Sequence, residues 1–545
     1  MVCGIDLGTT YSVVSYRDKS GKIVFIKDES GSSLIPSVVC YADETYYGRE
    51  AVENEENFPQ STIRSSKRFI GKNVDLLDGI SPTKVATDIL SYLKKITEIQ
   101  TQDKIDGVVI TVPAYFNQNQ RLETKLAAET ANLSVLRIIN EPTAGALAYG
   151  EDSSINELVL IYDFGGGTLD ITLLQLTEDN VYQVLSTSGD TKLGGDDLDE
   201  VIVDEFIKSL PKYFKPFKDF KVRLKKFAEE TKIQLNYKQQ VKKTLKYSGT
   251  INGHIHHHNF SISQERYLEL IEKILVKTKS HVLNSLNDAN KKVSNLSKII
   301  LVGGSTKSKF IKEYIKKEFN TKVYHDIDPD LAVSYGAATL AHSITEKNDN
   351  GAILIDVTPL SLGIETKGGL MTKIIPRNST IPLSTSQEFI TSEDNQEFVA
   401  IRIYQGERPL AKDNANLGEF ELSGFEKRPK GQTIIIVKFE IDVSGLITVT
   451  AFDKLSGLQS TVELNPLTSE EINAIMDENE FNYQNDQSVV EKIELENLKE
   501  LAKNLMFSVK LVNGDEDLKL TYNSVKDNII ALKVFINDLK LNKNV

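Results

Sequence analysis

The sequence predicts a multidomain protein with a large α/β domain, an apolar linker, a compact antiparallel β domain and a short helical tail. Strand-like apolar runs such as Val108–Val112 and Ile299–Val302 alternate with helical patterns such as Lys84–Ile96 in the first part. Short β-prone runs such as Thr433–Ile441 follow the linker, and the pattern becomes helical from Thr468. The expected boundaries are residues 1–346, 347–357, 358–466 and 467–545, in that order.

The remaining elements follow from the same periodicities. In the α/β part they are a strand at Leu158–Tyr162 and helices at Gln120–Thr130 and Leu198–Leu210. In the β part they are Ile374-Ile375, Ala400–Tyr404, Phe420–Leu422 and Leu446–Phe452. Thr468-Ser469-Glu470-Glu471 is a capping-box pattern that predicts a helix start, and Val489–Phe507 and Thr521–Leu539 have helical spacing.

The composition limits the classes of function. With 545 residues the chain is long enough for about three domains, and its two cysteines exclude a disulfide scaffold. The net charge of −13 argues against general nucleic-acid binding, which needs a surplus of Lys and Arg. We expect no membrane association, because no apolar run reaches the roughly 18 residues of a membrane span. The N-terminus has no targeting pattern, so we expect a cytoplasmic protein, or one of an organelle matrix if a presequence precedes this sequence.

A weak internal repeat joins two distant glycine-rich turns. Gly4–Val13 resembles Ile161–Asp170, since both have an apolar strand, an Asp, a turn of Gly and Thr, and a second β-prone run. Backbone N–H groups in such turns can bind phosphate oxygens. The first turn offers Gly8, Thr9 and Thr10, and the second offers Gly165, Gly166, Gly167 and Thr168. Asp6 and Asp163 precede the turns and can hold the waters of a hydrated Mg²⁺.

Three further features point to the same chemistry but are weak when each is taken alone. Gly303 and Gly304 follow a strand and let the backbone approach a flat ligand, although they equally fit ordinary strand-to-helix packing. Lys67 is a candidate for reaching a γ-phosphate or its attacking water, and its alternative is a solvated surface charge. Glu141 stands at a turn before a helix of small residues, where its alternative is a helix cap.

Taken together, the motifs resemble the DnaK-type 70-kDa heat-shock chaperones from residue 1 to about 480. The matching segments are Gly4–Ser12, Lys67–Gly71, Thr111–Phe116, Asn140–Ala144, Asp163–Asp170, Leu193–Asp196, Leu301–Thr306 and Asp356–Thr366. The resemblance implies an actin/hexokinase-like ATPase domain, joined by the linker to a β-sandwich peptide-binding domain with a short α-helical lid. It implies ATP and ADP, Mg²⁺ and K⁺ as ligands.

The resemblance also implies roles for the matching positions. Catalysis would depend on Lys67, Glu141, Asp163, Thr168 and Asp170, and Asp6 and Asp163 would organise the metal ions. Nucleotide would contact Gly8, Thr9, Thr10, Tyr11, Gly165, Gly166, Gly167, Gly194, Gly195, Glu229, Lys232, Asn236, Gly303, Gly304, Ser305, Lys307 and Asp330. A peptide groove would be lined by Leu362, Ile364, Lys367, Phe389, Ser392, Val399 and Ile401, whose apolar members could equally be sandwich core.

The sequence departs from the family pattern in three places. Only nine residues lie between Gly71 and Ser81, where family members carry a longer segment, so one ATPase subdomain is trimmed. Lys367 occupies a groove position that is usually Met or Ala, with Ser392 opposite. The tail is short, so the lid is short.

The expected function is an ATP-dependent chaperone that binds and releases extended apolar peptide segments. Its implied partners are unfolded peptides, a J-domain co-chaperone and a nucleotide-exchange factor. Details such as Gly189–Asp197 and Ile375–Asn378 favour a specialised HscA-like chaperone of iron–sulfur cluster assembly, acting on a scaffold protein, and this alternative stays open. A small-molecule kinase or an actin-like filament protein of the same fold fits less well, because neither predicts the linker and the β domain.

Overall fold

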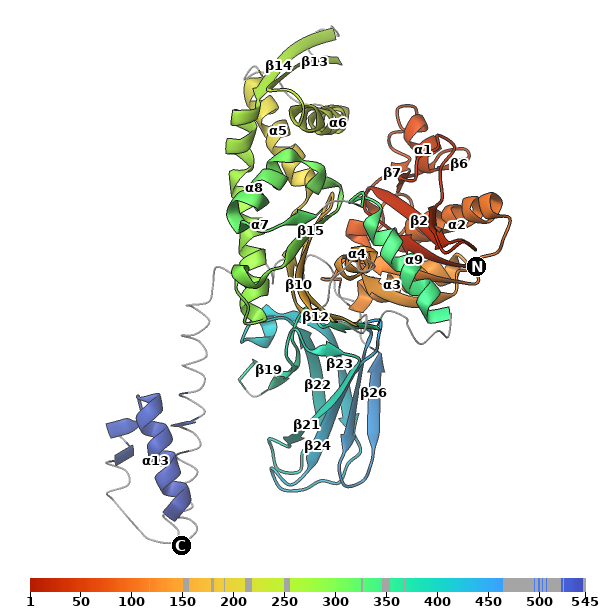
Figure 1. Ribbon diagram of the computed structural model, residues 1–545. Coiled ribbons are helices and arrows are strands. Elements are labelled where there is room, and N and C mark those ends of the chain that lie inside the picture. The colour runs from red at the N-terminus through yellow and green to blue at the C-terminus, as the bar shows by residue number, and fades with distance from the viewer. Residues whose placement is uncertain are drawn as a thin grey trace.

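A computed structural model describes most of the chain (Figure 1). The described residues are 1–116, 118–149, 156–177, 181–190, 192–210, 218–248, 255–324, 327–345, 353–366, 368–463, 495, 498–499, 502, 506, 521–522 and 524–542. Among them, no helix combines the length and apolar character needed to cross a membrane.

The first sheet has the order β3-β2-β1-β8-β9 and, with its helices, forms what we call the first lobe. Its strands are β1 (Val2–Asp6), β2 (Tyr11–Arg17), β3 (Ile23–Phe25), β8 (Gly107–Val112) and β9 (Val135–Asn140), with β4 (Ile35–Pro36) paired to β2. Strand β1 pairs antiparallel with β2 and parallel with β8. Helices α1 (Gly48–Asn54), α2 (Pro82–Thr101) and α3 (Gln118–Thr130) and the small sheet of β5 (Val39–Tyr41), β6 (Thr45–Tyr47) and β7 (Thr62–Ile63) complete the lobe.

The second sheet begins the second lobe and repeats this arrangement. Its order is β16-β15-β10-β11-β12-β17-β20. The strands are β10 (Glu157–Phe164), β11 (Leu169–Leu176), β12 (Val181–Asp190), β15 (Lys298–Val302), β16 (Val323–Tyr324), β17 (Ile353–Val357) and β20 (Thr380–Ile381). Strand β10 pairs antiparallel with β11 and parallel with β15, as β1 does with β2 and β8. The predicted internal repeat is therefore present as two similar hairpins in two sheets.

Helices α4 (Glu141–Tyr149) and α9 (Ala332–Thr345) join the two lobes. Their apolar faces share one buried cluster with residues of both sheets, including Val109 of β8 and Ile161 of β10. The two helices pack very closely, since a Cβ atom at Gly336 would fall 1.7 Å from the carbonyl oxygen of Ala144. Only glycine permits this approach.

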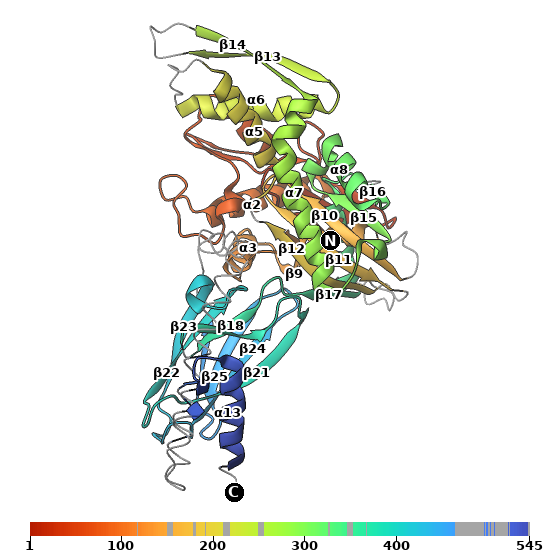
Figure 2. The same ribbon diagram turned by 90° about the vertical axis from the view of Figure 1, so that its left-hand side faces the viewer.

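Helices α5 (Gly195–Ser209), α6 (Lys218–Leu235), α7 (Gln264–Asp288) and α8 (Lys309–Phe319) belong to the second lobe. The hairpin of β13 (Gln240–Ser248) and β14 (Ile255–Ser263) lies at the top of the molecule in Figures 1 and 2. The core of this lobe is rich in aromatic residues, with Phe206 packed against Phe227 and Phe260.

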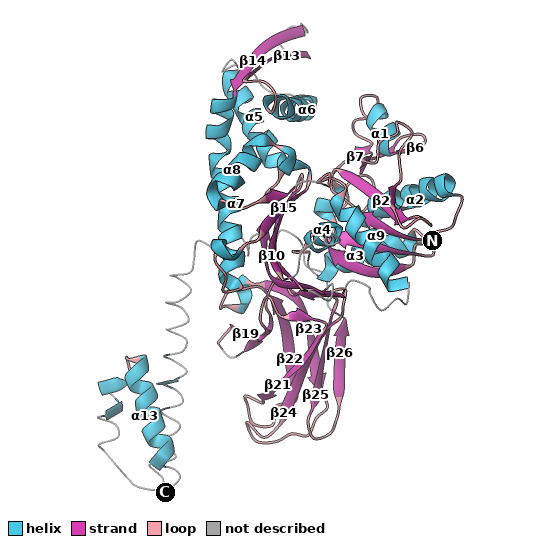
Figure 3. Ribbon diagram, viewed as in Figure 1, coloured by secondary structure: helices cyan, strands magenta, loops and turns pink. Residues whose placement is uncertain are grey.

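The β-rich part is a sandwich of two four-stranded sheets (Figure 3). One sheet contains β18 (Leu362–Thr366), β19 (Leu370–Ile375), β22 (Phe398–Gln405) and β23 (Ala415–Ser423). The other contains β21 (Leu383–Ile390), β24 (Ile434–Ile441), β25 (Ile447–Asp453) and β26 (Gln459–Glu463). Burial alternates along β24 and β25, as expected for strands with one face in a core.

The described part of the expected linker, Ile353–Val357, forms a strand of the second sheet. Strand β17 pairs parallel with β12, so that Tyr182 opposes Leu354, and antiparallel with β20 of the β-rich part. Leu354 and Val357 are buried in the cluster that contains α4 and α9. The apolar run therefore continues the sheet of the second lobe into the β-rich part.

The predicted strands and helices that lie within the described residues are present, with shifted ends. The helix expected at Leu198–Leu210 begins at Gly195, and the strands β18, β20, β21 and β26 were not singled out from the sequence. The capping box at Thr468–Glu471 lies outside the described residues, as does most of Val489–Phe507. Of the tail, α13 (Ile529–Asn542) is described and overlaps the helix expected at Thr521–Leu539.

Candidate functional site

Five charged side chains predicted from separate motifs come together between the lobes. Asp6 ends β1, Lys67 lies in the short 3₁₀ helix η1 (Ser66–Phe69), and Glu141 begins α4. Asp163 and Asp170 lie opposite each other on β10 and β11. Lys67 Nζ donates to Glu141 Oε1 at 2.5 Å, and Lys67 is buried. Neither the surface-charge alternative for Lys67 nor the simple helix-cap alternative for Glu141 fits this buried ion pair.

The electrostatics of the cluster are unbalanced, because four carboxyl groups share one lysine. Burial and the nearby Glu141 carboxylate raise the pKa of Asp170 to about 7, although the backbone N–H of Ala114 donates to it. Burial also raises the pKa of Asp6 and, with Glu141 and Asp170 adding to it, the pKa of Asp163 well above its usual range. A bound cation would relieve this excess of negative charge.

The residues fit a hydrated metal ion better than a direct metal cage. Among the described residues, no three carboxylate, imidazole or thiol groups are arranged to coordinate a metal ion directly. Mg²⁺ usually keeps several waters and binds through one or two carboxylates together with substrate phosphates. Asp6 and Asp163, at the ends of the two central strands, are placed to hold such waters.

The second glycine turn, Gly165–Thr168, accepts three hydrogen bonds from two other segments of the second lobe. The carbonyl oxygen of Gly165 accepts from the backbone N–H of Gly195 at 2.9 Å and from Ser305 Oγ at 2.8 Å. The carbonyl oxygen of Gly166 accepts from the N–H of Asp196 at 2.8 Å. These bonds use the carbonyl groups of the turn. The start of α5 and the turn of Gly303, Gly304 and Ser305 are thereby fixed against the second glycine turn.

The first glycine turn, Gly8–Thr10, meets the second across the lobes. Thr10 Oγ1 lies 2.8 Å from where a Cβ atom of Gly166 would stand, so a side chain at position 166 would collide with it. Burial and the Glu229 carboxylate raise the pKa of the neighbouring Tyr11. The two turns therefore lie on facing sides of one site.

Several positions predicted to contact nucleotide lie on the second-lobe side of the site. Lys232 Nζ lies 2.9 Å from Asp199 Oδ1 and donates to the carbonyl oxygen of Gly195 at 3.2 Å. Lys307 Nζ lies 2.6 Å from Asp330 Oδ2. Asn236 Oδ1 accepts from the N–H of Lys309, and a Cβ atom at Gly304 would lie 2.7 Å from Asp330 Oδ1. All the residues predicted for nucleotide thus lie in segments that meet in this region.

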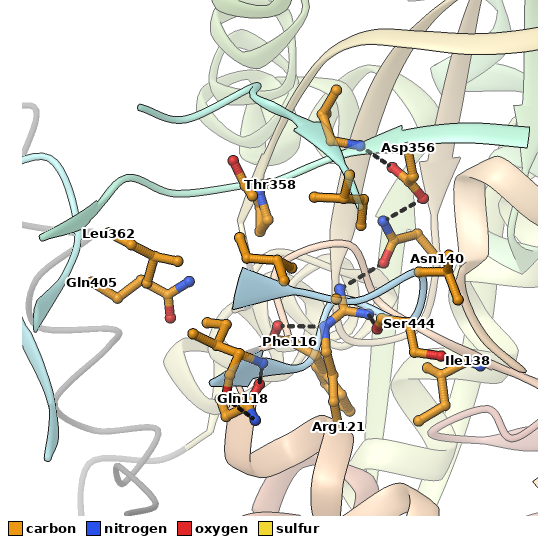
Figure 4. A pocket seen from close by; sticks show the side chains of 17 residues that line it. Phe116, Gln118, Arg121, Ile138, Asn140, Asp356, Thr358, Leu362, Gln405 and Ser444 are labelled. Atoms are coloured by element: carbon orange, nitrogen blue, oxygen red, sulfur yellow. Dashed lines mark hydrogen bonds between the residues drawn. The ribbon is translucent and has the colours of Figure 1, made fainter. Parts of the chain in front are cut away.

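A buried hydrogen-bond network leads from this site to the β17 strand and the β sandwich (Figure 4). Arg121 Nη2 donates to the carbonyl oxygen of Ala114, whose N–H binds Asp170, and to Asn140 Oδ1 at 2.6 Å. Asn140 Nδ2 donates to Asp356 Oδ2 at 2.9 Å. Arg121 Nη1 also reaches the carbonyl oxygen of Ser444 in the sandwich at 3.4 Å.

This network lines a small crevice between the first lobe and the sandwich, and its charges are buried. Burial lowers the pKa of Arg121 to about 10, and burial raises the pKa of Asp356. Gln118 adds a second link, because its side-chain oxygen accepts from the N–H of Ile447 at 2.8 Å while its amide nitrogen donates to the carbonyl oxygen of the same residue.

The residues predicted to line a peptide groove do not share one kind of environment. Leu362, Ile364 and Ile401 are buried in the sandwich core, and Phe389 and Val399 are half-buried against it. Ser392 is exposed and its N–H donates to Gln396 Oε1, whereas Lys367 lies outside the described residues. The three buried side chains therefore serve as core in this structure, and their role in a groove stays a prediction.

Several residues of the site were not singled out from the sequence. Thr111 donates to Asp6 Oδ1 at 3.1 Å, and Asp199 pairs with Lys232. Arg68 spans the two lobes, and Arg121, Asn140 and Asp356 form the buried network. Arg68 could have been identified as a site residue from its position directly after Lys67. Nothing in the sequence distinguished Arg121 from an arginine on the surface.

Known proteins match the chain over nearly its whole length. The family model described as "Hsp70 protein" matches residues 2–78 and 75–538, and its break falls in the short segment between Gly71 and Ser81. The chaperone protein dnaK of Cyanidium caldarium is 39% identical over 533 residues, covering 91% of this chain and 86% of that protein. The chaperone protein DnaK of Mycoplasmopsis pulmonis is 41% identical, covering 91% and 84%. A chaperone protein HscA homolog of Haemophilus influenzae is 39% identical, covering 89% and 81%. By both measures, this chain belongs to the Hsp70 family of chaperone proteins.

Proposed function

We propose that this chaperone hydrolyses ATP between its two lobes and uses the reaction to control the binding of extended apolar peptide segments. The observation that carries the proposal is the buried cluster of Asp6, Asp163, Asp170 and Glu141 around Lys67, flanked by two glycine turns. Buried carboxylates of this number are costly unless a ligand compensates them. A nucleotide triphosphate with its hydrated metal ion supplies that compensation.

The chain's own residues have distinct roles in the proposed reaction. The N–H groups and hydroxyls of Thr9, Thr10 and Thr168 hold the phosphates, and Glu141 keeps the Lys67 ammonium in place. Lys67 stabilises the charge that develops on the transferred phosphoryl group and orients the attacking water, aided by Asp170. Mg²⁺, with K⁺ beside it, would be held through water by Asp6 and Asp163 and would supply charge neutralisation of the phosphates.

The buried network supports a coupling between nucleotide and peptide. Asp170 in the site, Arg121 in α3, Asn140 beside Glu141, and Asp356 in β17 are linked by consecutive hydrogen bonds. A change at the phosphates that moves Glu141 or Asp170 would alter the contacts of Asp356. Coupling of this kind requires one element with two alternative arrangements. We propose that this element is β17, which is either paired with β12 or released from it.

The proposed function also assigns a role to each of the four predicted parts of the chain. Residues 1–346 form the ATPase domain, 347–357 the linker, 358–466 the peptide-binding sandwich and 467–545 a short lid. Partners of this chaperone are peptides with apolar side chains, a J-domain co-chaperone and a nucleotide-exchange factor. A cytoplasmic location is part of the same proposal.

The test is ATP turnover by the full chain, measured with and without an unfolded apolar peptide. We expect slow basal hydrolysis that needs Mg²⁺ and rises several-fold with peptide. A matched control replaces Lys279, which pairs with Glu318 on the surface of the second lobe, by alanine and should behave as wild type. Hydrolysis that responds to a sugar or another small acceptor, and not to peptide, would favour the kinase alternative.

A second candidate is the specialised chaperone of iron–sulfur cluster assembly. It is favoured by relatives named HscA homolog, which match at 38–39% identity over 518 residues, close to the values for relatives named DnaK. The two candidates differ in client range. A panel of unrelated apolar peptides should stimulate hydrolysis broadly for a general chaperone, and only a few related peptides should do so for the specialist.

A further inference from the structure

Arg68 directly follows Lys67, but the two side chains contact different lobes. Lys67 pairs with Glu141, which directly follows strand β9 of the first lobe. Arg68 Nη2 lies 3.0 Å from Asp196 Oδ2 and 3.4 Å from the carbonyl oxygen of Gly166, both in the second lobe. The main chain at Arg68 belongs to the first lobe, because Ile70, two residues on, is buried in that lobe's core.

Asp196 is fixed just as firmly to the second lobe. It lies in the first turn of α5, between Leu193 and Leu198, which are both buried in that lobe's core. Its N–H donates to the carbonyl oxygen of Gly166, the same atom that Arg68 approaches. Arg68 therefore contacts the start of α5 and the second glycine turn at one point.

The guanidinium group lies against the backbone of the second glycine turn. A Cβ atom at Gly167 would stand 2.7 Å from both Nε and Nη2 of Arg68, so only glycine at this position lets the arginine approach. Arg68 Nε is buried, and among the described residues it has no hydrogen-bond acceptor. The side chains of Arg68 and Asp196 are 33% and 37% exposed, so their ion pair is partly shielded from water.

We propose that Arg68 and Asp196 form a clasp that holds the two lobes closed over bound nucleotide and slows its release. The proposal rests on the proposed nucleotide site. Any opening of the lobes that separates η1 from the second glycine turn must break this ion pair. Arg68 is a positioning residue here, because it restrains the turn that binds phosphate and is adjacent to Lys67.

The test measures release of a fluorescent ADP and a fluorescent ATP from the full chain by stopped-flow displacement. We expect Arg68→Gln and Asp196→Asn each to speed release by about 3- to 10-fold, in the range of a partly buried ion pair. Because both remove the same interaction, the double variant should release nucleotide no faster than the single variants. The exchanged pair, Arg68→Asp with Asp196→Arg, should return the rate to within about 2-fold of wild type.

The matched control is Arg266→Gln. Arg266 Nε lies 2.9 Å from Glu205 Oε1 on the same helix α5, but this pair lies within the second lobe, so its loss should leave release unchanged. The unfolding temperature of each nucleotide-free variant is measured alongside, because a clasp acts on the closed, nucleotide-bound arrangement and a purely structural role would lower this temperature.

The outcomes distinguish failure of the proposed nucleotide site from failure of the clasp. If the wild-type chain does not bind the fluorescent nucleotides, the proposed function itself fails. If it binds them and neither single change alters release, the clasp is excluded while the proposed function stands. Faster release in Arg68→Gln alone, with Asp196→Asn unchanged, would mean that Arg68 holds the nucleotide directly, and that too overturns the clasp.

Discussion

The site between the lobes was inferred first from residue patterns, whereas the groove of the β sandwich was inferred from the family resemblance alone, and the buried residues of the two regions differ in chemistry. At Lys67 and Asp163, buried ionisable groups cost free energy and add little to the stability of the fold, so their presence points to a ligand. At Leu362 and Ile401, buried apolar side chains stabilise the sandwich whether or not a peptide binds. A charged motif therefore identifies a site more sharply than an apolar one.

The largest expected effect is at Lys67. Lys67→Ala should keep nucleotide binding and lower turnover by about 100-fold or more, since one charge-stabilising group at the transferred phosphoryl contributes on that scale. Single-turnover hydrolysis of radiolabelled ATP measures it, and Lys279→Ala is the control. Normal turnover in Lys67→Ala would remove this lysine from the reaction and weaken the contrast between the two regions.

The next largest effect is expected at Asp170, where one substitution should raise the stability of the protein and lower its ATP turnover. Its pKa is raised from the ordinary 3.8 to about 7, chiefly by burial and by Glu141. The stability it contributes is fully present below pH 4 and is lost as pH rises through 7. Asp170→Asn should therefore stabilise the nucleotide-free protein at pH 8, by on the order of 2 kcal/mol, while turnover falls.

The control for this prediction is Asp28, whose pKa is shifted in the opposite direction. Burial of Asp28 is outweighed by hydrogen bonds from Ser30, the N–H of Ser32 and Arg49, so its pKa is lowered. Asp28→Asn should destabilise the protein at pH 8. Urea unfolding at pH 5 and pH 8 tests both variants, and equal effects of Asp170→Asn at the two pH values would contradict the electrostatic account.

An intermediate effect is expected where the two regions meet. Leu354 is buried in β17 and Ile355 is half-buried, so Leu354→Asp with Ile355→Asp should undock the strand. Peptide stimulation of ATP turnover should fall from several-fold to none, and binding of ATP and of peptide should persist. Leu455→Asp, at an exposed turn of the sandwich, is the control. Stimulation that survives the double change would exclude β17 as the coupling element.

The smallest effect is expected at the predicted groove. The family resemblance assigns Lys367 to a groove position that is usually apolar, so we predict that Lys367→Met strengthens binding of generic apolar peptides by about 3-fold, the scale of a partly buried apolar contact. Fluorescence anisotropy on the full chain with several labelled peptides measures this. Unchanged affinity for every peptide would separate Lys367 from the groove and leave client range to other residues.

The network at Arg121 shows why part of the site escaped prediction. Asp356 lies 216 residues from Asn140, and although Asn140 and Asp356 belong to family-matching segments, no local pattern pairs them with each other or with Arg121. Only the packing of α3 against β9 and the addition of strand β17 to the second sheet bring them together. A pairing between separate elements has no local periodicity from which it could be predicted.

The sequence by itself determined the order of the parts, the two glycine turns and the charged residues beside them. Those features are local, since a strand, an Asp and a turn of Gly and Thr are read from adjacent residues. Tertiary structure decided which partner each charged side chain contacts, since the adjacent Lys67 and Arg68 pair with Glu141 and Asp196, respectively. It also decided that the apolar linker is a strand of the second sheet and that Leu362 is core, because burial depends on neighbours brought from elsewhere in the chain.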